Sequence, residues 1–468
     1  MCTVLLVTSV VGALALHTAS SLPLEAGTGL RTTAIADTAA SARHLRKAGT
    51  ARTTEDHRDQ AVDTVLKTMT GALRTGNEKS FLSVVDPRVP ALQTRQRSVF
   101  RTLHSLGADN LLLERRRGMS RSAGSSQPTG TTVVGVRMSY RLTSWDTQPV
   151  TADLAMAFTP GTGGSWLLRA TTGDGTAWKM GTDQYLEPWL LGGLQIVRRG
   201  HVLLVGDADR SEDNADLADD LEDAALTVRK IWQEQTWNGK VVAFAVRDEK
   251  FLDAWFDGQV STSEDTDPDA PATFDAQVQT ISSDWGREIG MPRMAIAPYL
   301  LGQRDDGLRR LLRHEIAHVA LFRTGWGPVP TWLEEGAAEF TGWGAEAGGG
   351  VAPTAALGQR GLPESQWKAL RSRKWRPTLV ADSGQFYAGS GEKVGTAYAS
   401  AWLTCLYIAD RYGPARLRAL YRATATYPGD RSAAEAEQIA LRSVLNTDRA
   451  GLRSQVGAFA YELRKGFD

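Results

Sequence analysis

The stretch RHEIAHVALFRTGWGPVPTWLEEGAAEF, residues Arg313–Phe340, contains two of the chain's seven histidines together with four glutamates. His314 and His318 are four residues apart, and on an α-helix this spacing places two side chains one above the other on one face. Both imidazoles can then reach one ion, and tetrahedral zinc accepts imidazole together with carboxylate. The first half of the stretch therefore predicts a helix that carries a metal site.

The residues around this helix fit the prediction. Asp305 or Asp306 can cap its N-terminus, and Gly325 can end it. Glu315 is rotated by about 100° from the histidine face, so it can reach a water on the metal but is badly placed as a third ligand. The alternative is a pair of helix histidines that make only ordinary hydrogen bonds.

The second half of the stretch predicts another helix, which begins at Thr331. Pro328 and Pro330 exclude a helix before that residue. Residues 331–334, TWLE, have the capping-box pattern, in which the threonine oxygen and the Glu334 carboxylate each accept a hydrogen bond from the other residue's amide. The pattern gives Glu334 a structural role.

Glu335 and Glu339 lie one turn apart on one face of this second helix. One carboxylate can complete a His, His, Glu ligand set, and the other can accept the remaining N–H of a ligand histidine. Gly336 lies in the helix interior, where it destabilises the helix by about 1 kcal/mol relative to alanine. We therefore expect another element to approach closely at this glycine.

The motif pair HEIAH and WLEEGAAEF resembles the gluzincin metallopeptidases, the peptidase MA-like superfamily that includes thermolysin and the membrane alanyl aminopeptidases. In that family the glutamate before the glycine of the second motif is the third zinc ligand. The resemblance therefore implies Zn2+ bound by His314, His318 and Glu335, with Glu315 as the general base. It also implies that Glu339 supports a ligand histidine from outside the ligand set.

The same resemblance suggests a residue that stabilises the negatively charged oxygen, the oxyanion, formed during hydrolysis. It also concerns where in a peptide the protein would cleave. Tyr398 lies at an offset from Glu335 similar to that of the aminopeptidase tyrosine, which implies a role in stabilising the oxyanion. The alternative for Tyr398 is an ordinary half-buried helix tyrosine. The Gly-x-Met-Glu-Asn segment with which the aminopeptidases hold a substrate's amino terminus does not occur in the sequence. Exopeptidase specificity is therefore not implied.

The composition limits the other classes of function. Lys+Arg and Asp+Glu both number 53, so no net charge attracts nucleic acid, and we expect no nucleic-acid partner. The 42% hydrophobic and 23% charged residues are typical of a soluble globular protein. Cys405 lies at helical spacing among apolar residues, so we expect a buried side chain and not a nucleophile.

The first residues predict export. An apolar run from Val4 to Leu16, followed by small and polar residues, predicts a signal peptide over residues 1–21 and a secreted or extracellular protein. No Lys or Arg precedes the run, and the alternatives are an N-terminal membrane anchor or a buried helix. Residues 22–54 are rich in Ala, Thr, Gly and Arg, which predicts a disordered linker.

The remaining chain is expected to form an α+β protein in four parts. Residues 55–190 have the pattern of helices followed by alternating strands and resemble the cone-shaped nuclear-transport-factor-2-like fold. Such a domain either binds a small ligand or serves as a spacer, and both roles stay open. Residues 191–345 are expected to form a zincin-like catalytic domain, with a mixed sheet against the HEIAH helix. Residues 346–392 predict a loop-rich connection, and residues 393–468 predict a C-terminal helical lobe.

These features predict zinc-dependent hydrolysis of a peptide or protein substrate. The strand around residues 294–297 is expected to pair with an extended peptide by edge addition. Two alternatives remain. One is a zinc-binding pseudoenzyme, and the other is a ligand-binding or scaffold protein in which the N-terminal domain is the functional part.

Overall fold

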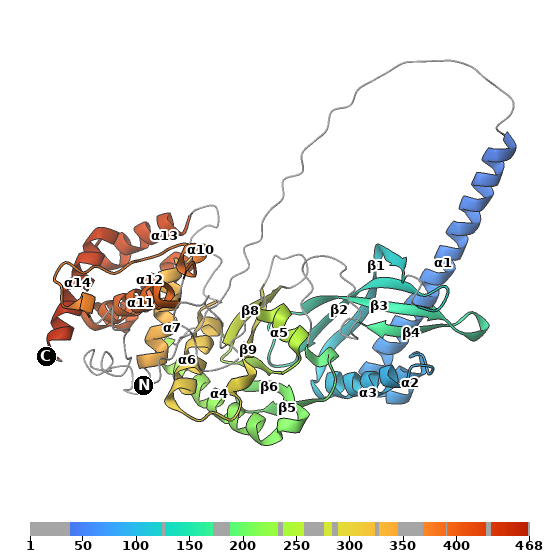
Figure 1. Cartoon of the computed structure of the whole chain (residues 1–468), viewed down its shortest axis with the longest axis horizontal. Coiled ribbons are helices and arrows are strands. Elements are labelled where there is room, and N and C mark those ends of the chain that lie inside the picture. Colours follow the sequence, from blue (N-terminus) through green and yellow to red (C-terminus); the bar gives the residue numbers. More distant parts are fainter. Residues whose placement is uncertain are drawn as a thin grey trace, which may run out of the picture.

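The computed structural model describes residues 38–123, 127–171, 188–232, 237–256, 276–282, 289–322, 327–344, 368–389, 391–426 and 432–466. Within these ranges the strands form two sheets, and the C-terminal part of the chain is helical (Figure 1). The predicted α+β class and the helical C-terminal region are confirmed. The predicted signal peptide, residues 1–21, lies outside the described residues, as does about half of the connection predicted over residues 346–392.

The first part of the structure is a sheet preceded by helices. The helices are α1 (Thr38–Thr75), α2 (Glu78–Ser83) and α3 (Pro90–Ser105). The strands are β1 (Ala108–Ser122), β2 (Thr132–Leu142), β3 (Val150–Pro160) and β4 (Trp166–Thr171). They pair antiparallel in sequence order. The order of helices before strands agrees with the sequence, although the polar edge strand β1 was not predicted.

Helix α1 corrects one prediction. It begins at Thr38, so residues 38–54 form helix and not the disordered linker predicted over residues 22–54. Alanine and arginine favour helix without any tertiary contact, whereas apolar periodicity appears only where a helix packs on a core. The first part of α1 projects away from both sheets (Figure 1). The missing periodicity was therefore wrongly interpreted as a linker over residues 38–54.

The second sheet is mixed, as predicted. Its strands are β5 (Leu194–Arg198), β6 (Val202–Asp207), β7 (Val241–Ala245), β8 (Ala276–Ser282) and β9 (Ile289–Ile296). Their order is β5-β6-β7-β9-β8. The neighbours β6, β7 and β9 run parallel, whereas β5 and β8 run antiparallel to the strands beside them.

The position of β9 corrects the predicted peptide-pairing strand. β9 contains residues 294–296 and pairs with β7 on one side and β8 on the other, so its backbone groups are already bonded. An extended peptide cannot add to it. The edge strands of this sheet are β5 and β8, and β8, whose sequence AQVQTIS alternates weakly, was not recognised as a strand. The prediction of edge addition at residues 294–297 is therefore wrong.

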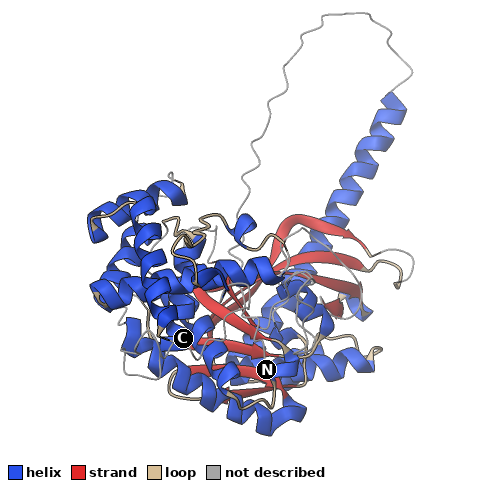
Figure 2. Ribbon diagram, turned by 60° about the vertical axis from the view of Figure 1, so that its left-hand side comes forward, coloured by secondary structure: helices blue, strands red, loops and turns tan. Residues whose placement is uncertain are grey.

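The helices after the first sheet are α4 (Ser211–Trp232), α5 (Glu249–Phe256), α6 (Asp306–Leu321), α7 (Thr331–Gly344), α10 (Ser383–Phe386), α11 (Gly391–Tyr412), α12 (Pro414–Ala425), α13 (Ala433–Ala440) and α14 (Arg449–Lys465). A short π-helical turn, Leu441–Leu445, separates the last two. Helices gather on the side of the molecule away from the projecting α1 (Figure 2). None of the described helices is long and apolar enough to cross a bilayer.

Successive side chains of a strand point to opposite faces of its sheet. In the central strands, one set of side chains therefore packs in a first hydrophobic core and the other set in a second. Val202 and Leu204 of β6 pack with α4, α6, α7 and the C-terminal helices. Leu203 and Val205 pack with α5, the N-terminal helices and the first sheet. The second sheet is therefore buried on both faces, which explains its continuous apolar strands.

The two sheets share the second core. Trp189, in the short 3-10 helix Pro188–Leu190, lies edge-on to Tyr140 and Phe244, with ring centroids 5.2 and 5.7 Å away. Arg293 of β9 donates two hydrogen bonds of 2.6 and 2.9 Å to Asp146, and both side chains are 0% exposed. A pair buried this deeply stabilises only while both partners stay in place. Packing is thus continuous across the predicted border between residues 190 and 191.

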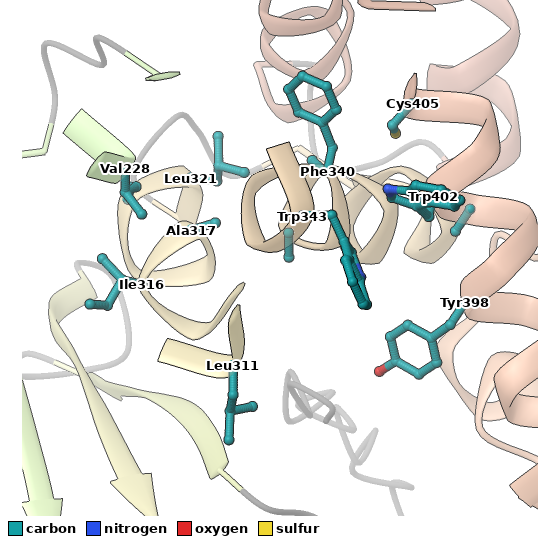
Figure 3. Packing of buried hydrophobic residues seen from close by; sticks show 14 of the residues in the cluster. Val228, Leu311, Ile316, Ala317, Leu321, Phe340, Trp343, Tyr398, Trp402 and Cys405 are labelled. Carbon is teal, nitrogen blue, oxygen red and sulfur yellow. The ribbon is translucent and has the colours of Figure 1, made fainter. Parts of the chain in front are cut away.

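Helix α7 lies between α6 and α11 (Figure 3). Gly336 permits the contact with α11, because a Cβ on this glycine would lie 2.5 Å from the Ala401 carbonyl oxygen and 2.7 Å from Cys405 Sγ. The predicted close approach at Gly336 is confirmed. So is the burial of Cys405, whose thiol is fully enclosed.

Candidate metal centre

His314 and His318 of α6 and Glu335 of α7 converge on one point. The Nε2 atoms of the two histidines lie 3.1 Å apart. Oε2 of Glu335 lies 3.4 Å from Nε2 of His314 and 3.5 Å from Nε2 of His318. Within the described residues, these three side chains form a group that could hold a metal ion. All three are buried.

The three distances fit a tetrahedral zinc ion. Ligand atoms about 2.0–2.1 Å from such an ion lie about 3.3 Å from one another. The observed spacings of 3.1, 3.4 and 3.5 Å are close to that value. Oε2 of Glu335 is buried and accepts no hydrogen bond from the described residues. A buried carboxylate oxygen that faces two imidazole nitrogens without a donor is the arrangement that a cation would complete.

Local sequence explains the position of the histidines. The Asp305 carboxylate caps α6 by accepting the Leu308 amide at 2.8 Å, which confirms the predicted cap. α6 ends at Leu321, and Gly325, the predicted end, lies outside the described residues. Ile316 points from α6 toward the side on which Val228 of α4 lies (Figure 3), while His314 faces α7.

Glu339, one turn beyond Glu335, faces the other nitrogen of His314. Its Oε1 lies 3.3 Å from His314 Nδ1, and its Oε2 accepts a hydrogen bond of 3.1 Å from the Trp343 indole. The guanidinium of Arg310 covers the Trp343 ring at 4.1 Å from the centroid. A carboxylate in this position can fix the tautomer and orientation of a ligand histidine.

Glu315 is separate from the ligand group but adjacent to it. Its Oε1 lies 3.9 Å from His314 Nε2, and its side chain is 0% exposed. The carboxylate is therefore placed beside the point where the three ligand atoms meet and not among them. This geometry suits a group that exchanges a proton with a molecule at that point.

The position of Glu334 corrects the predicted capping box. The Thr331 amide, which the box would pair with Glu334, donates instead to the Ala381 carbonyl at 3.1 Å, and the Thr331 hydroxyl donates to the same oxygen. The Glu334 carboxylate lies 4.0 Å from His318 Nδ1. A distant segment caps α7, and Glu334 is therefore free to approach the second histidine.

Sequence reasoning missed Tyr387. Its hydroxyl donates a hydrogen bond of 2.6 Å to Glu335 Oε1, the oxygen that does not face the histidines. Tyr387 follows the four-residue helix α10 in a segment predicted as loop, and no pattern in that segment points to the site. The contact arises only because the chain returns to α7.

Tyr398, the predicted oxyanion residue, lies near the site but not on the ligand group. Its ring centroid is 6.3 Å from that of His314 and 5.0 Å from that of Phe386, and the residue is 2% exposed. The structure thus brings two tyrosines to the site where the sequence indicated one.

The carboxylates make the site favourable for positive charge. Burial alone would lower the pKa of His314, but the nearby carboxylates of Glu335 and Glu339 raise it to about 10. Burial would raise the pKa of Glu335, but the charge of His318 and the proximity of both histidine rings hold that pKa well below its usual range. Burial raises the pKa of Glu334 to about 7. The nearby carboxylates therefore favour a positive charge on His314.

Comparison with known proteins does not assign the chain to a family. The sequence matches no family model, and no curated protein is significantly similar to it. The chemistry of the site must therefore be argued from its own residues.

Proposed function

We propose that the protein is a zinc-dependent hydrolase of peptide bonds with a zincin-like catalytic domain. The observation that carries the proposal is the spacing of the three atoms His314 Nε2, His318 Nε2 and Glu335 Oε2, at 3.1–3.5 Å from one another. This spacing matches the edges of a zinc tetrahedron with one position left for substrate or water.

In this proposal the ion supplies Lewis-acid polarisation of the scissile carbonyl and lowers the pKa of water. Glu315 accepts a proton from the attacking water and passes it to the leaving amine as the C–N bond breaks. The position of the Glu315 carboxylate, 3.9 Å from His314 Nε2, supports this role. Glu339 holds His314 in the orientation that presents Nε2 to the ion.

Two tyrosines are candidates for stabilising the oxyanion. We propose Tyr398 ahead of Tyr387, because the single hydroxyl proton of Tyr387 is already donated to Glu335 Oε1 at 2.6 Å. Burial, together with the charge of Glu335, raises the pKa of both phenols well above the usual value. Each phenol therefore keeps its proton and can donate a hydrogen bond.

The edge strand β8 replaces β9 as the candidate for pairing with an extended peptide, since one of its sides pairs with no strand among the described residues. Helices α1–α3 followed by the antiparallel sheet β1–β4 support the proposed nuclear-transport-factor-2-like fold of the N-terminal part. Secretion remains a proposal from the sequence of residues 1–21.

A second candidate is a zinc-binding protein that does not cleave peptides. One observation favours it: His314, Glu315 and Glu335 are each 0% exposed. In this conformation a peptide cannot reach the carboxylate base. Hydrolysis therefore requires the site to open, whereas metal binding alone does not.

Replacement Glu315→Gln distinguishes the two candidates. The chain and this variant would be incubated with a mixed peptide library, with zinc or with a chelator, and the products identified by mass spectrometry. We expect cleavage by the zinc-loaded chain, and none with chelator or in the variant, while the variant still binds zinc. The control is Glu392→Gln on the exposed first turn of α11, which should cleave normally. Equal cleavage by the Glu315 variant would refute the mechanism.

A further inference from the structure

A segment far along the chain caps the helix that carries Glu335. We call residues 377–387 the strap. The Ala381 carbonyl accepts the Thr331 amide at 3.1 Å, and the Val380 carbonyl accepts the Trp332 amide at 2.9 Å. These amides are two of the donors that the first turn of any helix leaves unpaired. The strap therefore fixes the N-terminal end of α7.

Helix α14 holds the strap from its other side. The Arg449 guanidinium donates to the Leu379 carbonyl, and Arg453 Nε donates to the Pro377 carbonyl at 2.9 Å. Gly457 brings α14 close, since a Cβ there would lie 2.4 Å from the Trp375 carbonyl oxygen. The strap is thus bonded through its backbone to α7 and to α14.

Arg449 is itself anchored in the C-terminal lobe. Its other terminal nitrogen donates a hydrogen bond of 3.1 Å to Glu437 of α13, whose side chain is 2% exposed. A nearly buried carboxylate is stabilised by a charged donor, so the pair restrains the direction of the guanidinium. Arg449 therefore links α13 to the Leu379 carbonyl.

The end of the strap reaches the metal site. Asp382 caps the short helix α10 by accepting the Gln385 amide at 3.0 Å, and Phe386 is buried edge-on against Tyr398. The next residue, Tyr387, donates its hydroxyl to Glu335 Oε1. With Oε1 held in this way, Oε2 is the oxygen that faces the two Nε2 atoms.

We propose that Arg449 is a positioning residue of the metal centre, acting through the strap and Tyr387 on the orientation of the Glu335 carboxylate. The guanidinium lies on the last helix of the chain and contacts none of the three ligands in the described structure. Its effect on the metal would be transmitted by the Leu379 carbonyl, which Arg449 contacts, and by the Tyr387 hydroxyl, which contacts Glu335. This inference rests on the proposed zinc site.

A double-mutant cycle on zinc affinity tests the proposal. The dissociation constant of Zn2+ would be measured by competition with a chelating dye for the wild type, Tyr387→Phe, Arg449→Met and the double variant. We expect each single variant to bind zinc about tenfold more weakly, the range found for outer-shell partners. We expect the double variant to bind no more weakly than Tyr387→Phe, since both changes remove one chain of contacts.

Additive losses in the double variant would overturn the proposal, as would an unchanged affinity in Arg449→Met. Arg416→Met is the matched control, because its guanidinium also bonds a carbonyl of the lobe, that of Val444 at 3.2 Å, but does not touch the strap. It should leave zinc affinity unchanged.

If Arg449→Met does not fold, Glu437→Gln replaces it in a second cycle with Tyr387→Phe, and the two losses of zinc affinity should again be non-additive. A wild-type chain that binds no zinc would overturn the proposed function and this inference together, whereas tight wild-type binding with additive losses overturns the inference alone.

Discussion

The two helices of the candidate metal site are capped in different ways. α6, which carries both histidines, takes its cap from the adjacent residue, because the Asp305 carboxylate accepts the Leu308 amide. α7, which carries Glu335 and Glu339, takes its cap from Ala381, fifty residues further along the chain. One half of the site is thus stabilised by local sequence and the other half by tertiary structure.

Because the two caps differ, substitutions near α6 and substitutions near α7 should have different effects on stability and on metal affinity. A change in the local cap of α6 should alter stability without turning either histidine, since both lie more than one turn from the capped N-terminal end of the helix. Changes at the remote contacts of α7 should alter stability and metal affinity together. Three substitutions test this separation.

The largest effect is expected at Gly336, where α7 touches α11. Gly336→Ala should destabilise the protein by about 1–3 kcal/mol, although alanine favours helix, because its Cβ would collide with the Ala401 carbonyl. Zinc affinity should fall as well. The matched control is Gly71→Ala in α1, where no atom lies within 4 Å and a gain of about 1 kcal/mol is expected. Urea unfolding of both variants checks this, and equal stabilisation of both would contradict the packing.

The next effect is expected at the cap of α6. Asp305→Ala should reduce the free energy of unfolding by about 1 kcal/mol, through loss of the bond to the Leu308 amide. Zinc affinity, measured by dye competition, should stay within error of the wild type. A clear loss of zinc affinity in this variant would show that the two halves are not separable.

The smallest change in stability is expected at Thr331. Thr331→Val removes the hydrogen bond from the hydroxyl to the Ala381 carbonyl but keeps the hydrogen bond from the backbone amide. The free energy of unfolding should therefore fall by only about 0.5 kcal/mol. Zinc affinity should nevertheless fall, because the strap carries Tyr387. Thr68→Val, which removes an exposed hydroxyl bond within α1, is the control and should leave zinc binding unchanged. Unchanged zinc affinity in Thr331→Val would mean that the strap does not act on the site.

Local signals explain what the sequence could predict. The i, i+4 histidines, the Asp305 cap and the close approach at Gly336 each depend on residues a few positions apart or on one residue type, and the structure bears out the cap and the close approach. The mixed sheet follows from apolar runs that are buried on both faces. The meeting of His314, His318 and Glu335 required the family resemblance in addition, because helix patterns alone left Glu335 and Glu339 open as the ligand.

Competition between local and remote partners explains the failures. Residues 331–334 have a correct capping-box pattern, but the Thr331 amide prefers the Ala381 carbonyl, which no local pattern reveals. Tyr387 was missed for the same reason, since its partner Glu335 lies 52 residues earlier. Strand order also depends on long-range pairing, so the apolar β9 was taken for an edge and the polar β8 was overlooked.

The zinc content of the protein tests the central claim most directly. The wild-type chain and Glu335→Ala would be loaded with Zn2+, dialysed against metal-free buffer and analysed by atomic emission. We predict one zinc ion per wild-type chain and none in the variant, because Glu335 supplies the third ligand atom at 3.4–3.5 Å from both histidine nitrogens. A wild-type chain without zinc, or a variant that retains it equally well, would contradict the account.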